Sequence, residues 1–593
     1  MLKYKLKNNC ISPQSETPMA DYLRSLGIDQ IESFMGTPDY MDELSPRLLL
    51  NIGRCVQMLH QGFEQNKRFL LIVDCDVDGY TSSSIFYRYF KNIYPNANIR
   101  WQLHEGKEHG LEADKLDDIG DDIDYVIIPD AGSAQLAEQQ VLLDRGKTLI
   151  VIDHHDITET LNHPNIVVVN NQNSPEFTNK HLSGAGVVLK VIQEYGRTYL
   201  TSGADDYYDL AALGIIADMM DMRELDNNYI AWRGLRTIRN KMFLGLLKQQ
   251  SYSINAKTVL ESGAPVPTKV DVAFYIAPLI NGVIRAGTQE DKELLFKGFI
   301  EEPTSEYVDT EFRGVQRHET FYEYVARNAY NVKNRQNTQK EKCMQYLKSR
   351  IEANNLHHNQ VIVVITSKDD KVPTPQNITG LVAMELLKEY GKPVLVLRPK
   401  TEDGKEYYRG SGRAKSAEGF DSFLEFMRGS QYCDYAEGHN FAFGASIAAN
   451  ALSAFIEESN ARLANVDFSS DFIEVDAIFN SNNINIQMLR EFAQYDYVYG
   501  NSIPQPRIVI KGIGSPANTR LMGTDGTSVR ITFGAVPCVK FKDAGLVESI
   551  QRNERNMVTV IGRPQLNEWN GITTVQLMAD YVEVEPLKSL SLF

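Results

Sequence analysis

The sequence predicts an α/β protein of several domains: a doubly wound parallel sheet, then a second α/β unit, then a small β-barrel. Residues 66–260 alternate apolar runs of strand length with stretches of helical spacing, as parallel strands and their crossover helices do. Residues 355–460 repeat this alternation. Residues 500–593 instead hold short β-patterned runs separated by Gly, Asn and Asp, which is typical of a small barrel.

Composition indicates a multidomain globular protein, with 593 residues, 43% hydrophobic and 23% charged. No run approaches 18 apolar residues and the N-terminus lacks a signal-peptide core, so we expect a cytoplasmic protein without a membrane segment. The six cysteines form no CxxC pair, which argues against a structural zinc site. The net charge of −16 argues against coating of duplex DNA but allows a narrow, locally basic path.

The first predicted strand, residues 69–73, runs directly into three aspartates, Asp74, Asp76 and Asp78. In an extended segment these alternate residues would share one side, where a divalent cation would relieve their repulsion. A solvated acidic turn is the alternative interpretation. Cys75 would point the other way, as a packed thiol rather than a nucleophile.

Two further predicted strands end in the same way. Residues 125–130 close on an aspartate, and residues 148–155 close on Asp-His-His. Because ligands gather at the carboxyl ends of parallel strands, these motifs predict one shared metal pocket. Asp218 lies beside the apolar face of a predicted helix, where an unpaired charge is costly, so it is a further candidate ligand.

Seven or eight oxygen and nitrogen donors would then converge, which is too many for one ion. The donors are Asp74, Asp76, Asp78, Asp130, Asp153, His154, His155 and Asp218. Carboxylates and imidazoles without thiolate suit Mn²⁺ or Mg²⁺. Two such ions would support in-line hydrolysis of a phosphodiester.

These motifs resemble those of the DHH phosphoesterases, and further segments narrow the resemblance to the RecJ family of single-strand-specific 5′-to-3′ exonucleases. The acidic motifs are DCDVDG at 74–79, PDAG at 129–132, DHH at 153–155 and ADMMDM at 217–222. The further segments are HLSGAGVV at 181–188, PLINGVIR at 278–285, GSGR at 410–413, EGHNFAFG at 437–444 and LNEWNG at 566–571. The chain departs from the family at His104 and His109, which stand where an Arg and a Tyr are usual, and at Glu437 and Phe443.

The resemblance implies roles for individual residues. Asp76 and Asp78 would contact different ions, Asp130 would bridge them, and His154 and Asp218 would complete the shell. Asp74, Asp153 and His155 would be catalytic: the two aspartates orient the metal ligands, and His155 faces the scissile phosphate. The substrate-binding residues would be Arg285, Arg335, Ser411, Arg413, His439 and Trp569.

Three of these substrate residues, Ser411, Arg413 and His439, are predicted in glycine-containing loops, where a phosphate can approach backbone N–H groups and a guanidinium. By the resemblance, Ser411, Arg413 and Arg285 would hold a 5′-terminal phosphate. His439 alone is more typical of a structural histidine. Trp569 would either stack on a base or plug the end of the barrel.

The resemblance also implies the domain order. The predicted segments are an N-terminal helical extension (1–65), a DHH catalytic domain (66–300), a connecting helix (301–355), a DHH-associated substrate-binding domain (356–465) and an OB-fold-containing C-terminal domain (466–593). The expected substrate is single-stranded DNA with a free 5′ end, and a single-strand-binding protein and a helicase are the expected partners. The alternatives are a DHH phosphodiesterase of oligoribonucleotides or cyclic dinucleotides, and a non-catalytic replisome scaffold.

Overall fold

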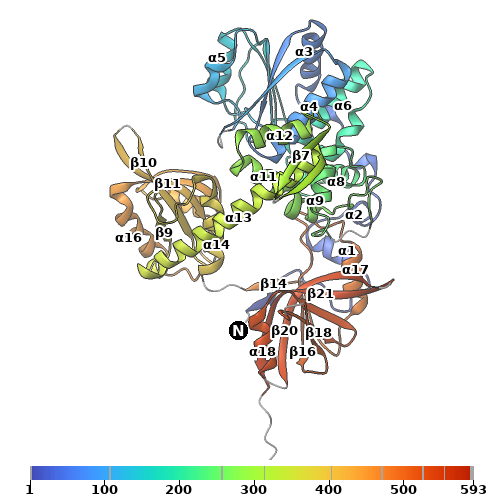
Figure 1. Ribbon diagram of the computed structural model, residues 1–593, viewed down its shortest axis with the longest axis vertical. Coiled ribbons are helices and arrows are strands. Elements are labelled where there is room, and N and C mark those ends of the chain that lie inside the picture. The colour runs from blue at the N-terminus through green and yellow to red at the C-terminus, as the bar shows by residue number, and fades with distance from the viewer. Residues whose placement is uncertain are drawn as a thin grey trace, which may run out of the picture. The chain divides into compact units, whose positions relative to one another are not determined.

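The computed structural model describes residues 3–105, 109–254, 258–312, 314–402, 404–468, 472–523, 526–552, 555–569 and 571–587. The chain divides into two compact units (Figure 1). The first unit comprises Met1–Ile284, Thr288–Ala329 and Ile473–Phe593, and the second comprises Arg285–Gly287 and Tyr330–Phe472.

A five-stranded, fully parallel sheet forms the centre of the first unit, as predicted. Its strands are β2 (Arg68–Val73), β3 (Asn98–Leu103), β4 (Tyr125–Pro129), β5 (Thr148–Asp153) and β6 (Ile166–Asn170). The spatial order is β3-β2-β4-β5-β6. The direction of winding therefore reverses between β2 and β4, and doubly wound folds bind their ligands at the strand ends beside such a point.

Helices surround this sheet in the same part of the chain. They are α3 (Ile52–Glu64), α4 (Val77–Ile93), α5 (Leu136–Asp144), α6 (Gly184–Tyr199), α7 (Tyr208–Ala217) and α8 (Leu225–Arg236). Helices α4, α6 and α7 pack against one another. The first turn of α4, which follows the end of β2, contains Asp78, and Asp218 comes directly after the last residue of α7, Ala217. These two helices therefore place Asp78 and Asp218 at the carboxyl edge of the sheet.

The N-terminal segment packs on two parts of the first unit, the C-terminal segment and the parallel-sheet region. Strand β1 (Tyr4–Leu6) pairs in parallel with β14 (Ile473–Val475). Helix α1 (Pro18–Ser25) packs on α17 (Ile486–Gln494), where the Met19 amide donates to Glu491 at 3.0 Å. Helix α3 packs on α6 and β6.

The predicted connecting segment contains a hairpin before its helix. Strands β7 (Tyr307–Phe312) and β8 (Val315–Thr320) pair antiparallel, and α13 then runs for 33 residues, Phe321–Ala353. None of the helices in the described ranges is both long enough and apolar enough to cross a bilayer.

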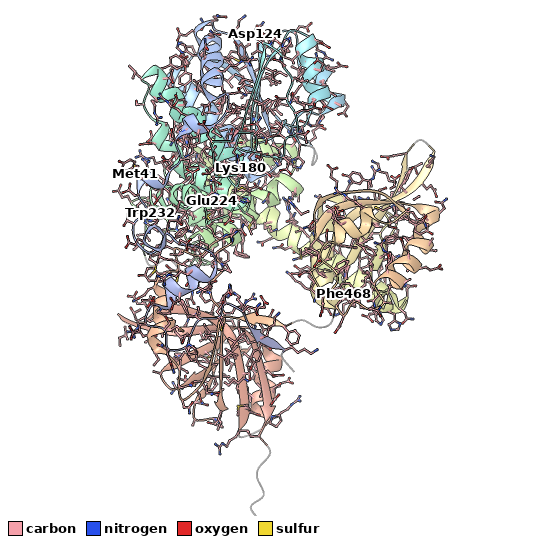
Figure 2. The ribbon with its side chains drawn as sticks, turned by 180° about the vertical axis from the view of Figure 1, so that it is seen from behind. Met41, Asp124, Lys180, Glu224, Trp232 and Phe468 are labelled. Atoms are coloured by element: carbon pink, nitrogen blue, oxygen red, sulfur yellow. The ribbon has the colours of Figure 1, made fainter. Side chains whose placement is uncertain are left out.

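A mixed five-stranded sheet forms the centre of the second unit, in the order β12-β13-β11-β10-β9. Its strands are β9 (Ile362–Ile365), β10 (Val394–Glu402), β11 (Lys405–Arg413), β12 (Cys433–His439) and β13 (Ala442–Ala448). Helix α14 (Thr379–Tyr390) packs on β10 and β11. Phe468, labelled in Figure 2, is buried in an apolar core with Phe420 and Phe443 on this unit.

The prediction that Ser411, Arg413 and His439 lie in loops is wrong, because all three lie in strands. Ser411 and Arg413 belong to β11, and His439 ends β12. The glycines of this region instead allow close packing: a Cβ at Gly412 would lie 2.7 Å from the Phe443 ring. The GSGR pattern therefore marks the tightly packed end of a strand.

A seven-stranded sheet forms the C-terminal part of the first unit, in the order β15-β16-β20-β21-β19-β18-β17. Its strands are β15 (Ala477–Asn480), β16 (Ile508–Gly514), β17 (Thr519–Met522), β18 (Ser528–Phe533), β19 (Val536–Lys540), β20 (Asn556–Trp569) and β21 (Ile572–Pro586). Strands β20 and β21 pair along their whole length, with a register shift between Ile561 and Gly562. The side chain of Trp569 lies outside the described residues.

Candidate metal centre

The three aspartates after β2 converge through a strand-to-helix turn. The strand ends at Val73, Asp76 caps α4 by accepting a 2.9 Å hydrogen bond from the Gly79 amide, and Asp78 lies in the first helical turn. The expectation that the segment stays extended is therefore wrong, because the helix begins at Val77. A Cβ at Gly79 would lie 2.6 Å from the Cβ of Asp74, so the turn requires glycine there.

Asp78 is buried against the start of α6. Its carboxylate accepts from the Ser183 hydroxyl at 2.9 Å and from the amides of Gly184 and Ala185 at 2.6 and 3.0 Å. The free amides and the positive end of a helix stabilise a carboxylate. The HLSGAGVV segment thus fixes an acidic residue of another motif.

Asp130 follows β4 with a left-handed backbone, φ +64°. Its Oδ1 is buried, lies 3.2 Å from His154 Nε2, and has no hydrogen-bond partner among the described residues. Burial, and then the charges of Asp78 and Asp76, raise the pKa of Asp130 well above its usual value. A raised pKa of this kind is typical of a carboxylate that has no cation beside it, and Asp130 has none among the described residues.

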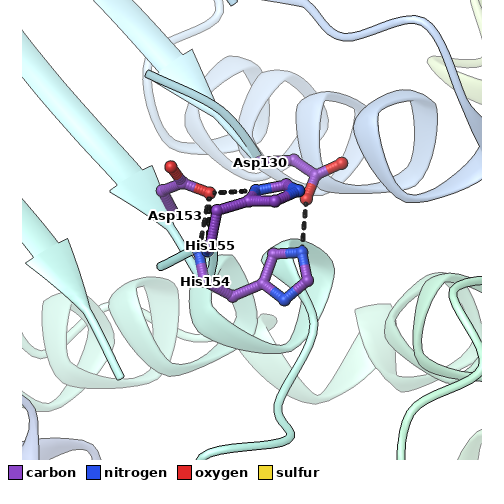
Figure 3. A group of neighbouring side chains, drawn as sticks. All are labelled: Asp130, Asp153, His154 and His155. Carbon is purple, nitrogen blue, oxygen red and sulfur yellow. Dashed lines mark hydrogen bonds and ion pairs between the residues drawn. The ribbon is translucent and has the colours of Figure 1, made fainter. Parts of the chain in front are cut away.

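The DHH motif places its three side chains in different directions (Figure 3). Asp153 Oδ1 accepts from the His154 amide at 2.7 Å and lies 2.8 Å from His155 Nδ1, while Oδ2 accepts from the Ser133 amide at 2.9 Å. Burial opposes ionisation, but the hydrogen bond and charge of His155 lower the pKa of Asp153 below its usual value. The hydrogen bond to Asp153 raises the pKa of His155 to about 9.

His154 and Asp218 extend the cluster toward α7. His154 Nε2 lies 3.5 Å from Asp218 Oδ2 and 3.9 Å from Asp78 Oδ2. Asp218 is the residue that caps the C-terminus of α7, immediately after the helix rather than within it. Burial, with Asp78 and Asp76, raises the pKa of Asp218 to about 8. Burial lowers the pKa of His154, which keeps the imidazole available as a ligand.

Two groups of donors that share no residue lie here, each with ligand atoms within 4.8 Å of one another. One group is Asp78, His154 and Asp218, and the other is Asp74, Asp76 and Asp130. Burial and the charges of Asp74 and Asp78 raise the pKa of Asp76 to about 6. Raised carboxylate pKa values and an unpartnered Asp130 oxygen are what a cation-binding site shows without its cation. The donors therefore fit Mn²⁺ or Mg²⁺.

Asp74 has partners that its motif does not reveal. Its Oδ1 accepts from the Gly110 amide at 2.9 Å, and its Oδ2 lies 2.7 Å from His109 Nδ1. His104, buried nearby, bonds to Glu112. The sequence identifies His104 and His109 only as departures from a family pattern, and their contact with Asp74 depends on the loop that follows β3.

The second unit brings together several predicted phosphate contacts. Ser411 Oγ lies 3.0 Å from Thr379 Oγ1 at the start of α14. A Cβ at Gly380 would lie 2.5 Å from the Arg413 guanidinium. Burial, and then the charge of Arg285, lower the pKa of Arg413.

The remaining predicted contacts lie around this cluster. Arg413 and His439 both pair with Ala442, from opposite sides, so their side chains share a face of the sheet. Arg335 is exposed on α13. Lys333 is half-buried on that helix, and burial with Lys340 and Arg285 lowers its pKa, so it adds a cation that the sequence does not single out.

Two family models match the chain. The DHH family, N-terminal domain, matches residues 68–215, and the RecJ OB domain matches residues 475–581. The first contains the acidic motifs up to the DHH triplet, and the second covers most of the seven-stranded sheet.

Relatives match over almost the whole chain. The YorK protein of the SPbeta prophage in Bacillus subtilis (strain 168), whose name assigns it to the single-strand DNA-specific exonucleases, is 31% identical over 97% of both chains. The single-stranded-DNA-specific exonuclease RecJ of the same organism is 23% identical over 95% of this chain and 67% of its own length.

The fold matches solved structures of RecJ. The Mn²⁺ complex of RecJ from Thermus thermophilus aligns with a TM-score of 0.69 at 19% identity, over 99% of this chain and 80% of that chain. The Mg²⁺ complex of the same protein aligns with a TM-score of 0.64 at 18% identity, over 99% and 79% of the two chains.

Proposed function

Because this chain belongs to the RecJ group of the DHH family, we propose that it is a metal-dependent exonuclease specific for single-stranded DNA. The observation that carries the proposal is the convergence of two donor groups at the point where the sheet reverses its winding. A pair of divalent ions suits these groups, and Mn²⁺ or Mg²⁺ suits their oxygen and imidazole donors. Bound ions would stabilise the charge of the phosphoryl group under attack.

The proposed ligands divide between the two groups. Asp78, His154 and Asp218 would hold one ion, and Asp76 with Asp74 would hold the other. Asp130 would bridge the two ions, because it lies close to ligands of both. Its Oδ1 is 3.2 Å from His154 Nε2, and one of its carboxylate oxygens lies within 4.8 Å of ligand atoms of Asp74 and Asp76. In this arrangement Asp74 is a ligand as well as an orienting residue.

His155 is proposed to bind the scissile phosphate. Its side chain is 60% exposed, and its hydrogen bond to Asp153 keeps the imidazole protonated at neutral pH. A cation held in a fixed direction can donate to a phosphate oxygen. Asp153 acts through His155 and is a positioning residue.

Hydrolysis from the 5′ end is the proposed polarity. The cluster of Ser411, Arg413 and Arg285 combines a hydroxyl, two guanidinium groups and the start of α14, and such a set suits a terminal phosphate. Release of 5′-mononucleotides follows from holding that end.

Several other features of the proposed function stay predictions. They are base stacking by Trp569, a cytoplasmic location, a role in DNA repair and recombination, and a single-strand-binding protein and a helicase as partners.

Oligonucleotides labelled at the 5′ or the 3′ end test the proposal directly. The protein is incubated with Mn²⁺ and single- or double-stranded substrate, beside an Asp78→Asn variant and an Asp117→Asn control, whose carboxylate is exposed on the surface. We expect mononucleotides from the 5′ end of single strands, with activity lost only in Asp78→Asn. Cleavage of only cyclic dinucleotides or very short oligoribonucleotides, or binding without hydrolysis, would contradict it.

A further inference from the structure

A second kind of donor cluster lies beside the proposed metal centre. Cys75 Sγ lies 3.7 Å from His109 Nε2 and 3.8 Å from His109 Nδ1. Asp74 Oδ2 lies 2.7 Å from His109 Nδ1. One sulfur, one nitrogen and one oxygen atom from these residues fall within 4.8 Å of one another. Of the donor groups in the described part of the chain, this one alone contains sulfur.

Its dimensions match those of a small tetrahedral site. With bonds of about 2.3 Å to sulfur and about 2.0 Å to nitrogen, tetrahedral zinc holds these two ligands roughly 3.5 Å apart. Cys75 Sγ lies 3.8 Å from His109 Nδ1, the ring nitrogen that also faces Asp74, and this separation is close to that value before any ion is present. Closing the site therefore needs only small side-chain movements.

This group contains a sulfur donor, which the groups of the main centre lack. Thiolate and imidazole favour Zn²⁺ and similar thiophilic ions, whereas carboxylate-rich groups suit Mg²⁺ and Mn²⁺. His109 is 62% exposed, which gives an ion a route to the buried sulfur of Cys75. His104 Nε2, buried without a hydrogen-bond partner among the described residues, lies 3.9 Å from Asp74 Oδ1 and so places a second imidazole beside the carboxylate of this group.

We propose that Cys75, His109 and Asp74 form a binding site for a thiophilic divalent cation, with Zn²⁺ as the natural occupant, beside the Mn²⁺/Mg²⁺ centre and sharing Asp74 with it. Three protein ligands would leave a fourth position open, as in zinc sites that are not purely structural. His109 lies 34 positions after Cys75 and 35 positions after Asp74, so no short sequence motif indicates this site.

Occupation of this site has a consequence for the main centre. Asp74 also belongs to the group with Asp76 and Asp130. An ion that draws Asp74 toward Cys75 removes that carboxylate from the group. Zn²⁺ at this site is therefore inhibitory toward reactions that depend on the neighbouring centre.

Cobalt provides a readout that does not require nuclease activity. The full chain, freed of metal and carrying Cys10→Ser to remove an exposed thiol, is titrated with Co²⁺. A cysteine ligand gives a thiolate-to-Co²⁺ charge-transfer absorption in the near ultraviolet, which a site of carboxylates and imidazoles does not give. We expect the band to saturate at one thiolate-bound Co²⁺ per chain, beside Co²⁺ bound without such a band at the carboxylate-rich groups, and we expect Zn²⁺ to abolish it by displacement.

Matched variants test whether the absorption band arises from Co²⁺ bound to Cys75. Cys75→Ser should abolish it, and His109→Gln, at an exposed side chain, should weaken Co²⁺ binding at least about tenfold. Cys433→Ser, at a half-buried cysteine of the second unit, should leave it unchanged. Far-ultraviolet circular dichroism verifies folding. Absence of the band in the Cys10→Ser protein, or its persistence in both Cys75→Ser and His109→Gln, would overturn the proposal whatever the outcome of the nuclease assay.

Discussion

Asp153 Oδ1 lies 2.8 Å from His155 Nδ1, so the buried carboxylate at the end of β5 fixes the direction of an exposed imidazole. The same oxygen accepts from the amides of His154 and His155 at 2.7 and 3.2 Å. One side chain thus holds both the backbone that carries a proposed metal ligand and the ring proposed to meet the phosphate.

Replacing Asp153 by Asn should therefore lower kcat without preventing substrate binding. Asn has the same shape but lacks the charge that keeps His155 protonated, and it presents an amide donor where an acceptor is needed. Loss of such a supporting carboxylate typically costs about 10–100-fold. Steady-state kinetics with single-stranded oligonucleotides measure the effect. A matching rise in KM with unchanged kcat would contradict the positioning role.

Gly184→Ala should disable the metal centre although glycine has no functional group. An added Cβ would lie 2.6 Å from the Cβ of Asp130, so the carboxylate proposed to bridge the two ions must move. A displacement of about 1 Å at a reacting centre can cost roughly a hundredfold in rate. We expect that loss in Mn²⁺-dependent hydrolysis, together with a higher Mn²⁺ requirement.

Gly53→Ala is the control for this substitution. Gly53 lies in α3, and its Cβ would meet no atom within 4 Å. Alanine there should leave activity unchanged and stabilise the helix by up to about 1 kcal/mol. Equal activity of the two variants would show that Gly184 does not protect the position of Asp130.

The stability of the metal-free protein should fall as the pH rises from about 6.5 to 9. The folded-state pKa values of Asp218 and His155 are raised to about 8 and about 9, from 3.8 and 6.5. The folded state therefore binds more protons than the unfolded chain in this window, and the stabilisation is lost as the pH passes the folded pKa values. Each extra proton contributes a slope of about 1.4 kcal/mol per pH unit.

Thermal unfolding at fixed ionic strength, with and without Mn²⁺, measures this dependence. The increase in Tm that Mn²⁺ produces should grow toward pH 8.5, because the ion replaces protons at the cluster. In Asp218→Asn the decrease in stability above pH 7 should be smaller. A metal-free protein whose Tm rises from pH 6.5 to 9 would contradict the assignment of raised pKa values.

Arg413→Ala should reduce the preference for a 5′-phosphorylated end. The guanidinium is half-buried beside Ser411 and the start of α14, and a charge-assisted hydrogen bond contributes about 1.5–3 kcal/mol. KM for 5′-phosphorylated single strands should therefore rise about ten- to hundredfold, while KM for 5′-hydroxyl strands changes little. Arg428→Ala, which removes an exposed arginine paired with Glu425, should change neither value. An unchanged phosphate preference would exclude Arg413 from end recognition.

The sequence predicts the strands and the acidic residues at their ends, because these depend on local pattern. Buried parallel strands such as β2 and β5 are continuous apolar runs, and a carboxylate cluster at their ends has few chemical explanations. The resemblance carried by several separate motifs then identified the family, which the comparison with YorK confirmed.

Tertiary structure decided which distant residues meet. The turn at Val77, rather than strand alternation, brings Asp74, Asp76 and Asp78 together, and the start of α6 supplies the amides that hold Asp78. The pairing of β1 with β14 and the contact of Cys75 with His109 join segments that no local pattern relates. Each depends on the path of a loop or the register of a strand, and these are set by packing across the whole fold rather than by the residues on either side.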